Sequence, residues 1–207
     1  MTGEEIQALL DAQRAFFNSG ATLSVDFRIK SLRRLYDAVK AHEGDIHAAL
    51  TADLGKSAYE GFMCESGLAL TEISYMIKHT RKLARRKTVR TPLAQFASHS
   101  FTQAVPYGNT LVMSPWNYPF LLTIDPLADA IAAGNTVILK PSAYSPATSA
   151  IIERMLRTRT RGGCHGRPCG KHRAARAEIR LHLLHGKPER RQRGAAPRRR
   201  IPHACRA

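Results

Sequence analysis

Cysteine is scarce in this sequence of 207 residues, which contains 4 cysteines, and Cys64 is alone among the first 156 residues. A small protein held together by disulfides needs several cysteines at regular spacings. The first three quarters of the chain therefore exclude a disulfide framework. An isolated thiol is typical of a reducing compartment, so we expect a cytoplasmic protein.

Long hydrophobic runs are also missing. The most apolar stretch, from Phe120 to Leu139, is interrupted by Asp125 and Asp129. A helix that crosses a bilayer needs about 20 predominantly apolar residues, so the sequence predicts no transmembrane span. Glu4 and Glu5 stand where a secretory signal peptide carries basic residues, so we expect no signal peptide.

Acidic residues are rare at one end of the chain only. The formal net charge is +16, and residues 157–207 contain 16 of the 32 Lys and Arg residues but only 2 of the 16 Asp and Glu residues. A strongly basic protein is typical of nucleic-acid or membrane-surface binding, yet this charge belongs to the last quarter. The composition therefore divides the chain at about residue 156.

Amphipathic helices dominate the first 83 residues. A capping-box pattern from Thr2 to Glu5 and a stop signal at Gly20 delimit the first helix. Three more are predicted from near Ser24, from near Asp45 to Gly55, and from Ser57 to Leu83. Their apolar stripes indicate packing rather than chemistry, and they include Leu9, Leu32, Leu35, Val39, Ile46, Leu50, Phe62, Leu70 and Ile73.

A strand, a helix and a second strand follow in about thirty residues. The strands are predicted at 111–113 and 136–139, and the helix between them ends at Gly134. Such a βαβ unit pairs its strands in parallel, and ligands of these sheets bind at the strands' carboxyl ends. Trp116-Asn117 and Lys140-Pro141-Ser142 occupy those ends. Ser145-Pro146 then starts a helix over 147–156.

The two strand ends carry the most specific motifs. Pro-Trp-Asn-Tyr-Pro at 115–119, followed by Gly-Asn-Thr-Val-Ile-Leu-Lys-Pro-Ser at 134–142, closely resembles the aldehyde dehydrogenase superfamily, most of all its short, fatty-aldehyde-type branch. The resemblance covers residues 1–156. It implies an α/β fold made of N-terminal helices and the first βαβ unit of a Rossmann-like NAD(P)-binding domain, in truncated form. It also implies an oligomerisation-arm strand at 98–106 and a homodimer.

The resemblance implies roles for six residues. Asn117 would donate its side-chain amide to the oxyanion that forms when an aldehyde is attacked, while Ser114, Pro115 and Trp116 would lie beside NAD or NADP. Lys140 would contact the adenosine ribose of that cofactor, and Ser142 beside it would be a further cofactor-binding residue. Three alternatives stay open: Asn117 only caps its turn, Lys140 is only an exposed cation, or Trp116 is only a core residue. No metal site is predicted. The family often carries a glutamate that grips the ribose hydroxyls at the position after Ser142, and Ala143 in its place weakens any claim to a strict preference for NAD over NADP.

Three family segments are missing. The Phe-Thr-Gly-Ser turn that cradles the pyrophosphate, the Glu-Leu-Gly-Gly-Lys segment with the catalytic base, and the Gly-Gln-x-Cys context of the nucleophile do not occur. A thioester mechanism needs an activated thiolate. We therefore expect an N-terminal fragment of an NAD(P)-dependent aldehyde dehydrogenase that does not oxidise aldehydes by itself.

Residues 157–207 lack any apolar periodicity and are predicted to be a basic, disordered tail. Cys164, His165, Cys169 and His172 match no common zinc pattern. An alternative function is a non-enzymatic helical domain with a basic nucleic-acid-binding arm. We favour a frameshift, because a reading one base later permits family-like segments, including Phe-Phe-Thr-Gly-Ser from Leu183 onward.

Overall fold

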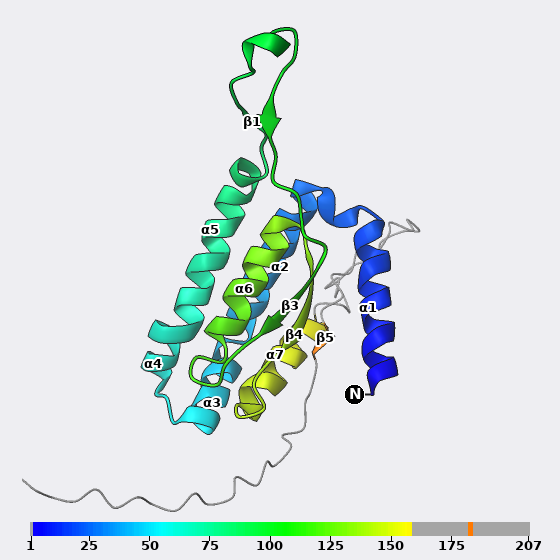
Figure 1. Ribbon diagram of the computed structural model, residues 1–207. Helices are drawn as coiled ribbons and strands as arrows, with labels where there is room; N and C mark the ends of the chain where they lie inside the picture. Colours follow the sequence, from blue (N-terminus) through cyan, green and yellow to red (C-terminus); the bar gives the residue numbers. More distant parts are fainter. Residues whose placement is uncertain (1, 159–181, 184–207) are drawn as a thin grey trace, which may run out of the picture.

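The structure, a computed structural model, describes residues 2–158 and 182–183. Helix α6 packs on the strands β3 and β4, α2 and α5 pack against α6, and α1 lies beside the same strands (Figure 1). The elements are α1 (Gly3–Asn18), η1 (Ala21–Leu23), α2 (Val25–Ala41), α3 (Glu43–Leu54), α4 (Ala58–Gly61), η2 (Phe62–Ser66), α5 (Gly67–Leu83), β1 (Lys87–Thr88), η3 (Leu93–Gln95), β2 (Phe101–Thr102), β3 (Asn109–Met113), α6 (Leu121–Ala133), β4 (Thr136–Lys140), α7 (Pro146–Thr158) and β5 (His182–Leu183).

The predicted helix starts are confirmed by their caps. The Thr2 hydroxyl accepts the Glu5 N–H at 3.3 Å, and the Glu5 carboxylate accepts the Thr2 N–H at 2.8 Å, which completes the capping box of α1. Ser24 and Ser57 accept amides at the starts of α2 and α4. Gly55 ends α3 in the left-handed conformation, with φ of 69°. These local signals were strong because each needs only neighbouring residues.

The prediction of one continuous helix from Ser57 to Leu83 is wrong in one respect. A π-helical turn, η2, separates α4 from α5 and adds one residue to the helical path. In one regular helix, Phe62 would lie on the same face as the buried residues Leu70 and Ile73 and would point into the core. The extra residue shifts the face by one position, so that Gly61 lies there instead. Phe62 is 42% exposed, and Glu65 is fully buried.

The βαβ unit is confirmed. Strands β3 and β4 pair in parallel, with Met113 opposite Lys140, and α6 connects them. Gly134 ends α6 with φ of 91°. Every residue of β4 except Lys140 is buried, as expected of an inner parallel strand. The fully buried core side chains come from five helices and β4, and they include Leu32, Leu35, Val39, Ile46, Leu50, Ile73, Phe120, Ile124, Leu127, Val137, Leu139, Ile152 and Met155.

A third strand corrects the prediction for the tail. β5 pairs in parallel with β4, with Ile138 opposite His182 and Leu139 opposite Leu183. Two residues beyond 157 therefore belong to the sheet, and α7 continues to Thr158. The rest of the predicted tail, including Cys164, His165, Cys169 and His172, lies outside the described residues. No described helix is long and apolar enough to cross a membrane.

The segment between α5 and β3 forms an arm that projects from the body (Figure 1). Its strand was predicted over 98–106, but β2 covers only Phe101–Thr102 and pairs antiparallel with β1. Leu93 and Phe96 at the tip are 92% and 86% exposed. At the base of the arm, Arg81 near the end of α5 pairs with Asp26 on α2, at 2.5 Å.

Three carboxyl groups gather between α5 and α6. Burial, with repulsion from Glu72 as the next cause, raises the pKa of Asp125 from 3.8 to about 6, and the pKa of Asp129 likewise to about 6. A carboxyl with a raised pKa in the folded state keeps its proton at pH values where the unfolded chain has lost it. The bound protons therefore add to the free energy of unfolding at low pH, and this contribution falls as the pH rises from about 4 to about 6.

Asp125→Asn is expected to raise the free energy of unfolding at neutral pH by about 1–2 kcal/mol, because it removes one of the mutually repelling charges. It should also flatten the fall of stability between about pH 4 and pH 7. Urea unfolding at several pH values measures both. Asp37→Asn, an exposed carboxyl on α2, is the control and should change neither. A loss of stability in Asp125→Asn at neutral pH would contradict the expectation.

Candidate functional site

Two loops meet at the carboxyl ends of β3 and β4. The Ser114 N–H donates to the Lys140 carbonyl at 3.2 Å, which extends the pairing of the strands by one bond. Further out, the Ser145 hydroxyl donates to the Trp116 carbonyl at 3.3 Å. The structure therefore brings together the two motifs that the sequence separates by about twenty residues.

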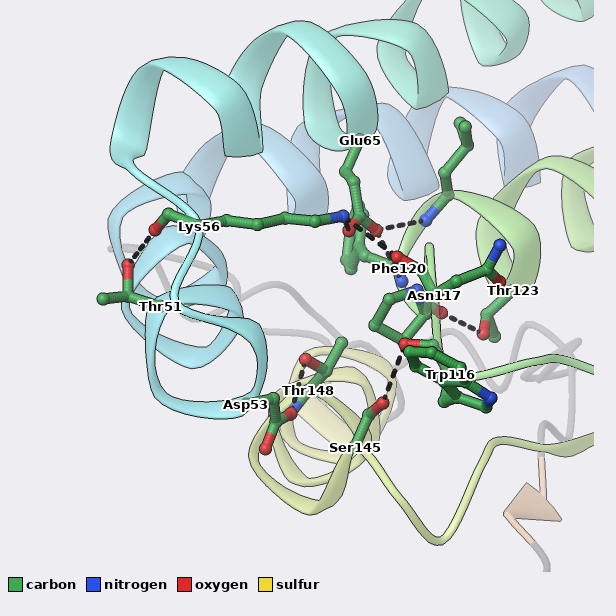
Figure 2. A network of polar contacts seen from close by, with 12 residues as sticks. Thr51, Asp53, Lys56, Glu65, Trp116, Asn117, Phe120, Thr123, Ser145 and Thr148 are labelled. Carbon is green, nitrogen blue, oxygen red and sulfur yellow. Dashed lines mark hydrogen bonds and ion pairs between the residues drawn. The ribbon is translucent and has the colours of Figure 1, made fainter. Parts of the chain in front are cut away.

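The side chain of Asn117 is exposed and makes no hydrogen bond to any described residue. Its carbonyl, by contrast, is held by Lys56. The amide therefore does not cap the turn between the two prolines, which was the alternative for this residue. Trp116 is 57% exposed, and Figure 2 shows its ring and the Asn117 amide pointing away from Lys56.

Lys140 and Ser142 lie on the second loop. Lys140 is half-buried, and its ammonium group has no hydrogen bond or ion pair with the described residues. Ser142 is half-buried, and its hydroxyl accepts the Tyr144 N–H at 3.2 Å while its carbonyl accepts from Ser149. The Ser142 hydroxyl keeps its own proton for another acceptor.

Ser114 is turned inward, whereas Pro115 is exposed. The Thr123 oxygen Oγ1 lies 2.6 Å from the Pro119 carbonyl and 2.7 Å from the Ser114 oxygen Oγ. A hydroxyl has one proton to donate and a carbonyl has none, so the Thr123 proton goes to the Pro119 carbonyl. The bond between Thr123 and Ser114 therefore uses the proton of Ser114. This contact ties the start of the loop to the first turn of α6. The Ser114 hydroxyl is therefore engaged inside the protein.

A buried ion pair beneath this loop was not foreseen from the sequence. Lys56 Nζ lies 2.5 Å from Glu65 Oε1, with side chains that are 9% and 0% exposed. Lys56 also donates to the Asn117 carbonyl at 3.1 Å, and its ammonium lies 4.1 Å from the centre of the Tyr118 ring. Glu65 Oε2 accepts the N–H groups of Phe120 and Leu121 (Figure 2).

One signal in the sequence could have revealed this pair. Glu65 precedes Ala69 by four residues and Ile73 by eight, so it lies on the apolar stripe of the predicted fourth helix. A carboxylate at such a position is rarely buried without a partner. The identity of the partner was not accessible, because Lys56 stands outside any helix and the loop it contacts is 61 residues away.

A second carboxylate closes the start of α7. Asp53 at the end of α3 accepts the N–H groups of Ala147 and Thr148 at 3.1 and 2.7 Å, and the Thr148 hydroxyl at 2.8 Å. Ser145 was predicted to cap this helix, but its hydroxyl serves the Trp116 carbonyl instead. Both helices that begin at the strand ends therefore have their free N–H groups occupied by protein carboxylates.

The site offers a neutral amide donor, a cation and an exposed aromatic face. Cys64 is the one cysteine among the described residues, and it lies half-buried in η2 beside Glu65. No group of three metal-ligating side chains occurs in the part of the chain that the structure describes. These groups can bind a polar ligand and stabilise negative charge.

A parallel βαβ unit with polar groups at its strand ends defines an α/β domain of the kind that binds ligands at this edge of the sheet. The family model for the aldehyde dehydrogenase family matches residues 1–160. The chain belongs to the aldehyde dehydrogenase family.

Individual relatives agree with this assignment. The 4,4'-diaponeurosporen-aldehyde dehydrogenase of Staphylococcus aureus is 41% identical over 143 residues, 69% of this chain and 31% of that protein. A dimeric NADP-preferring aldehyde dehydrogenase of Canis lupus familiaris is 42% identical over 68% of this chain and 31% of that protein. The substrate-bound structure of Staphylococcus aureus AldH has a TM-score of 0.76 and 33% identity, covering 90% of this chain and 37% of that one. The chain thus spans about a third of the length of these relatives.

Proposed function

We propose that this chain is the N-terminal portion of an NAD(P)-dependent aldehyde dehydrogenase, and that Asn117 supplies the oxyanion donor. The observation that carries this proposal is the unengaged amide of Asn117, held on a loop whose backbone is fixed from beneath. A donor aimed at developing negative charge in a site without water is worth roughly 3–4 kcal/mol. The sequence lacks the Gly-Gln-x-Cys and Glu-Leu-Gly-Gly-Lys segments of the family, so the oxidation itself needs residues that it does not contain.

Lys140 and Ser142 would hold the ribose of NAD or NADP, with Trp116 and Pro115 beside the cofactor and Ser114 facing it through the backbone. The Lys140 ammonium group has no partner among the described residues, the Ser142 hydroxyl has a proton to donate, and the Trp116 ring is exposed. These three groups fit a ligand that combines hydroxyl groups with flat rings. The pyrophosphate does not fit the two nearby helix N-termini, because Glu65 and Asp53 already occupy their N–H groups. The described residues therefore suit one end of the dinucleotide.

Lys140→Met is expected to weaken binding of NADH to this chain about tenfold or more, because a charge-assisted hydrogen bond contributes about 1.5–3 kcal/mol. Energy transfer from Trp116, the single tryptophan, to the bound reduced nicotinamide measures the affinity. Lys78→Met, an exposed cation on α5, is the matched control and should bind as the unchanged chain does. Equal affinity in both variants would remove Lys140 from the site. A parallel titration with NADPH decides the preference between the two cofactors.

The arm is proposed to pair two copies of the chain. Its tip exposes Leu93 and Phe96, and a relative of this chain carries the word dimeric in its name. Phe96→Asp is expected to shift a dimer to a monomer in sedimentation, because it places a charge in an apolar contact. Thr71→Asp on the exposed side of α5 is the control. A monomer before any substitution would contradict this assembly.

We also propose that the chain is cytoplasmic and that its residues after about 156 are translated out of frame. The family match ends at residue 160, and β5 lies at the start of the segment that gives Phe-Phe-Thr-Gly-Ser when read one base later. The DNA tests this directly. Read in the shifted frame, it should continue into Glu-Leu-Gly-Gly-Lys and a cysteine in the nucleophile's context. If the shifted frame contains neither segment, the basic tail is a real arm, and nucleic-acid binding becomes the function to test.

A further inference from the structure

We propose that Lys56 is a positioning residue that, together with Glu65, sets the orientation of the Asn117 amide. The inference rests on the function proposed above for Asn117. Lys56 itself touches no position that a substrate would occupy, because its ammonium group is buried under the loop. It acts through the backbone of the residue that carries the amide.

Three acceptors surround the Lys56 ammonium group. They are the Glu65 carboxylate at 2.5 Å, the Asn117 carbonyl at 3.1 Å and the face of Tyr118, whose centre is 4.1 Å away. An ammonium group has three protons, and these acceptors use them all. The bond to the carbonyl fixes the plane of the peptide that follows Asn117. The same bond holds the backbone of the residue whose Cα carries the amide side chain, so its loss would let that Cα and the side chain shift.

Glu65 anchors the other end of the same loop. It accepts the N–H groups of Phe120 and Leu121 at 2.9 and 3.1 Å with the oxygen that Lys56 does not use. The Trp116 carbonyl is held separately by Ser145. The five residues from Trp116 to Phe120 are thus fixed at three points, by partners from three different parts of the chain.

Stability alone does not explain a buried pair of this kind. Removing two charges from water costs about as much as their attraction returns, and well-packed apolar replacements are often neutral or stabilising. What an ion pair adds is direction, because each hydrogen bond has a defined angle. A displacement of about 1 Å at a catalytic group can cost on the order of a hundredfold in rate, so direction at Asn117 has a large effect on the reaction.

The test uses the full chain with the double substitution Lys56→Met and Glu65→Gln. The side-chain carbonyl introduced at position 65 can still accept one N–H at the start of α6, and no buried charge is left unpaired, so folding is retained. The Asn117 carbonyl loses its donor, the Tyr118 ring loses its cation, and one N–H group at the start of α6 loses its acceptor. Trp116, the single tryptophan, is its neighbour and reports on the loop. We expect a higher acrylamide quenching constant, a lower fluorescence anisotropy, and a shifted and broadened Asn117 side-chain amide signal by NMR, in a variant that still melts cooperatively.

The matched control removes an exposed ion pair between neighbouring elements, Asp45 on α3 and Arg154 on α7, through Asp45→Asn and Arg154→Gln. It should leave the Trp116 and Asn117 signals unchanged. The proposal is overturned if the Lys56 and Glu65 variant melts cooperatively and its Trp116 quenching and Asn117 signal match those of the unchanged chain.

If the double variant does not fold, the unchanged chain decides the question. Its Trp116 must then be as immobile as the folded body, and a freely rotating Trp116 refutes the positioning role. None of these measurements involves a dinucleotide or an aldehyde. Failure of the positioning role is therefore distinguishable from failure of the proposed function, which the NADH titration tests.

Discussion

Replacing Glu65 with alanine is expected to lower the free energy of unfolding by about 3–5 kcal/mol, the usual loss when one partner of a buried ion pair is removed. The substitution leaves the Lys56 ammonium group without its counter-ion at a site that is almost closed to water. It also leaves the Phe120 and Leu121 N–H groups at the start of α6 without an acceptor. The ammonium group and the two N–H groups then each have a higher free energy in the folded chain than in the unfolded chain, where water hydrates them.

Urea unfolding followed by circular dichroism measures this loss. Glu60→Ala is the matched control, because Glu60 lies on α4 one turn earlier and is exposed. It should change the free energy of unfolding by less than about 0.5 kcal/mol. The double substitution Lys56→Met and Glu65→Gln should be much less destabilising than Glu65→Ala. Equal losses from Glu60→Ala and Glu65→Ala would show that the pair is not buried as described.

Gly134→Ala is expected to lower the free energy of unfolding by about 3 kcal/mol, from backbone strain and overpacking together. Gly134 has φ of 91°, a conformation that side chains disfavour, and an added Cβ would lie 2.5 Å from Cζ of Arg28. Arg28 has little freedom to move, because it is buried and donates to the carbonyls of Thr22, Leu23 and Ala132.

The control for this substitution is Gly44→Ala in α3, where an added Cβ meets nothing within 4 Å. Alanine favours a helix over glycine by about 1 kcal/mol, so this variant should be slightly more stable. Thermal and urea unfolding of the two variants should therefore move in opposite directions. A Gly134→Ala variant as stable as the unchanged chain would mean that Arg28 can leave its three carbonyls without loss.

The parts of the fold that depend on neighbouring residues were predictable. The capping box at Thr2, the stops at Gly55 and Gly134, and the parallel pairing of β3 with β4 each follow from a short stretch of sequence. Residues in the two motifs were also placed together correctly. The parallel register brings the ends of both strands to the same edge of the sheet.

The parts that were missed depend on partners far apart in the chain. The contact of Lys56 with Asn117 spans 61 residues, and that of Asp53 with Thr148 spans 95. Ser145 had the correct position for a helix cap, yet a carboxylate from α3 took that role. β5 was missed because a two-residue strand has no periodicity of its own, and only the open edge of β4 gives it a partner.

The rotation of α4 relative to α5 about the helix axis depends on the single extra residue in the π-helical turn η2. Deleting one residue from Phe62–Ser66 would restore a regular helix and rotate everything before the deletion by about 100° about the axis. Phe62 would then turn toward the core in place of Gly61, and Lys56 would be carried away from the Asn117 carbonyl. The geometry at Asn117 is therefore sensitive to chain length in a segment more than fifty residues upstream.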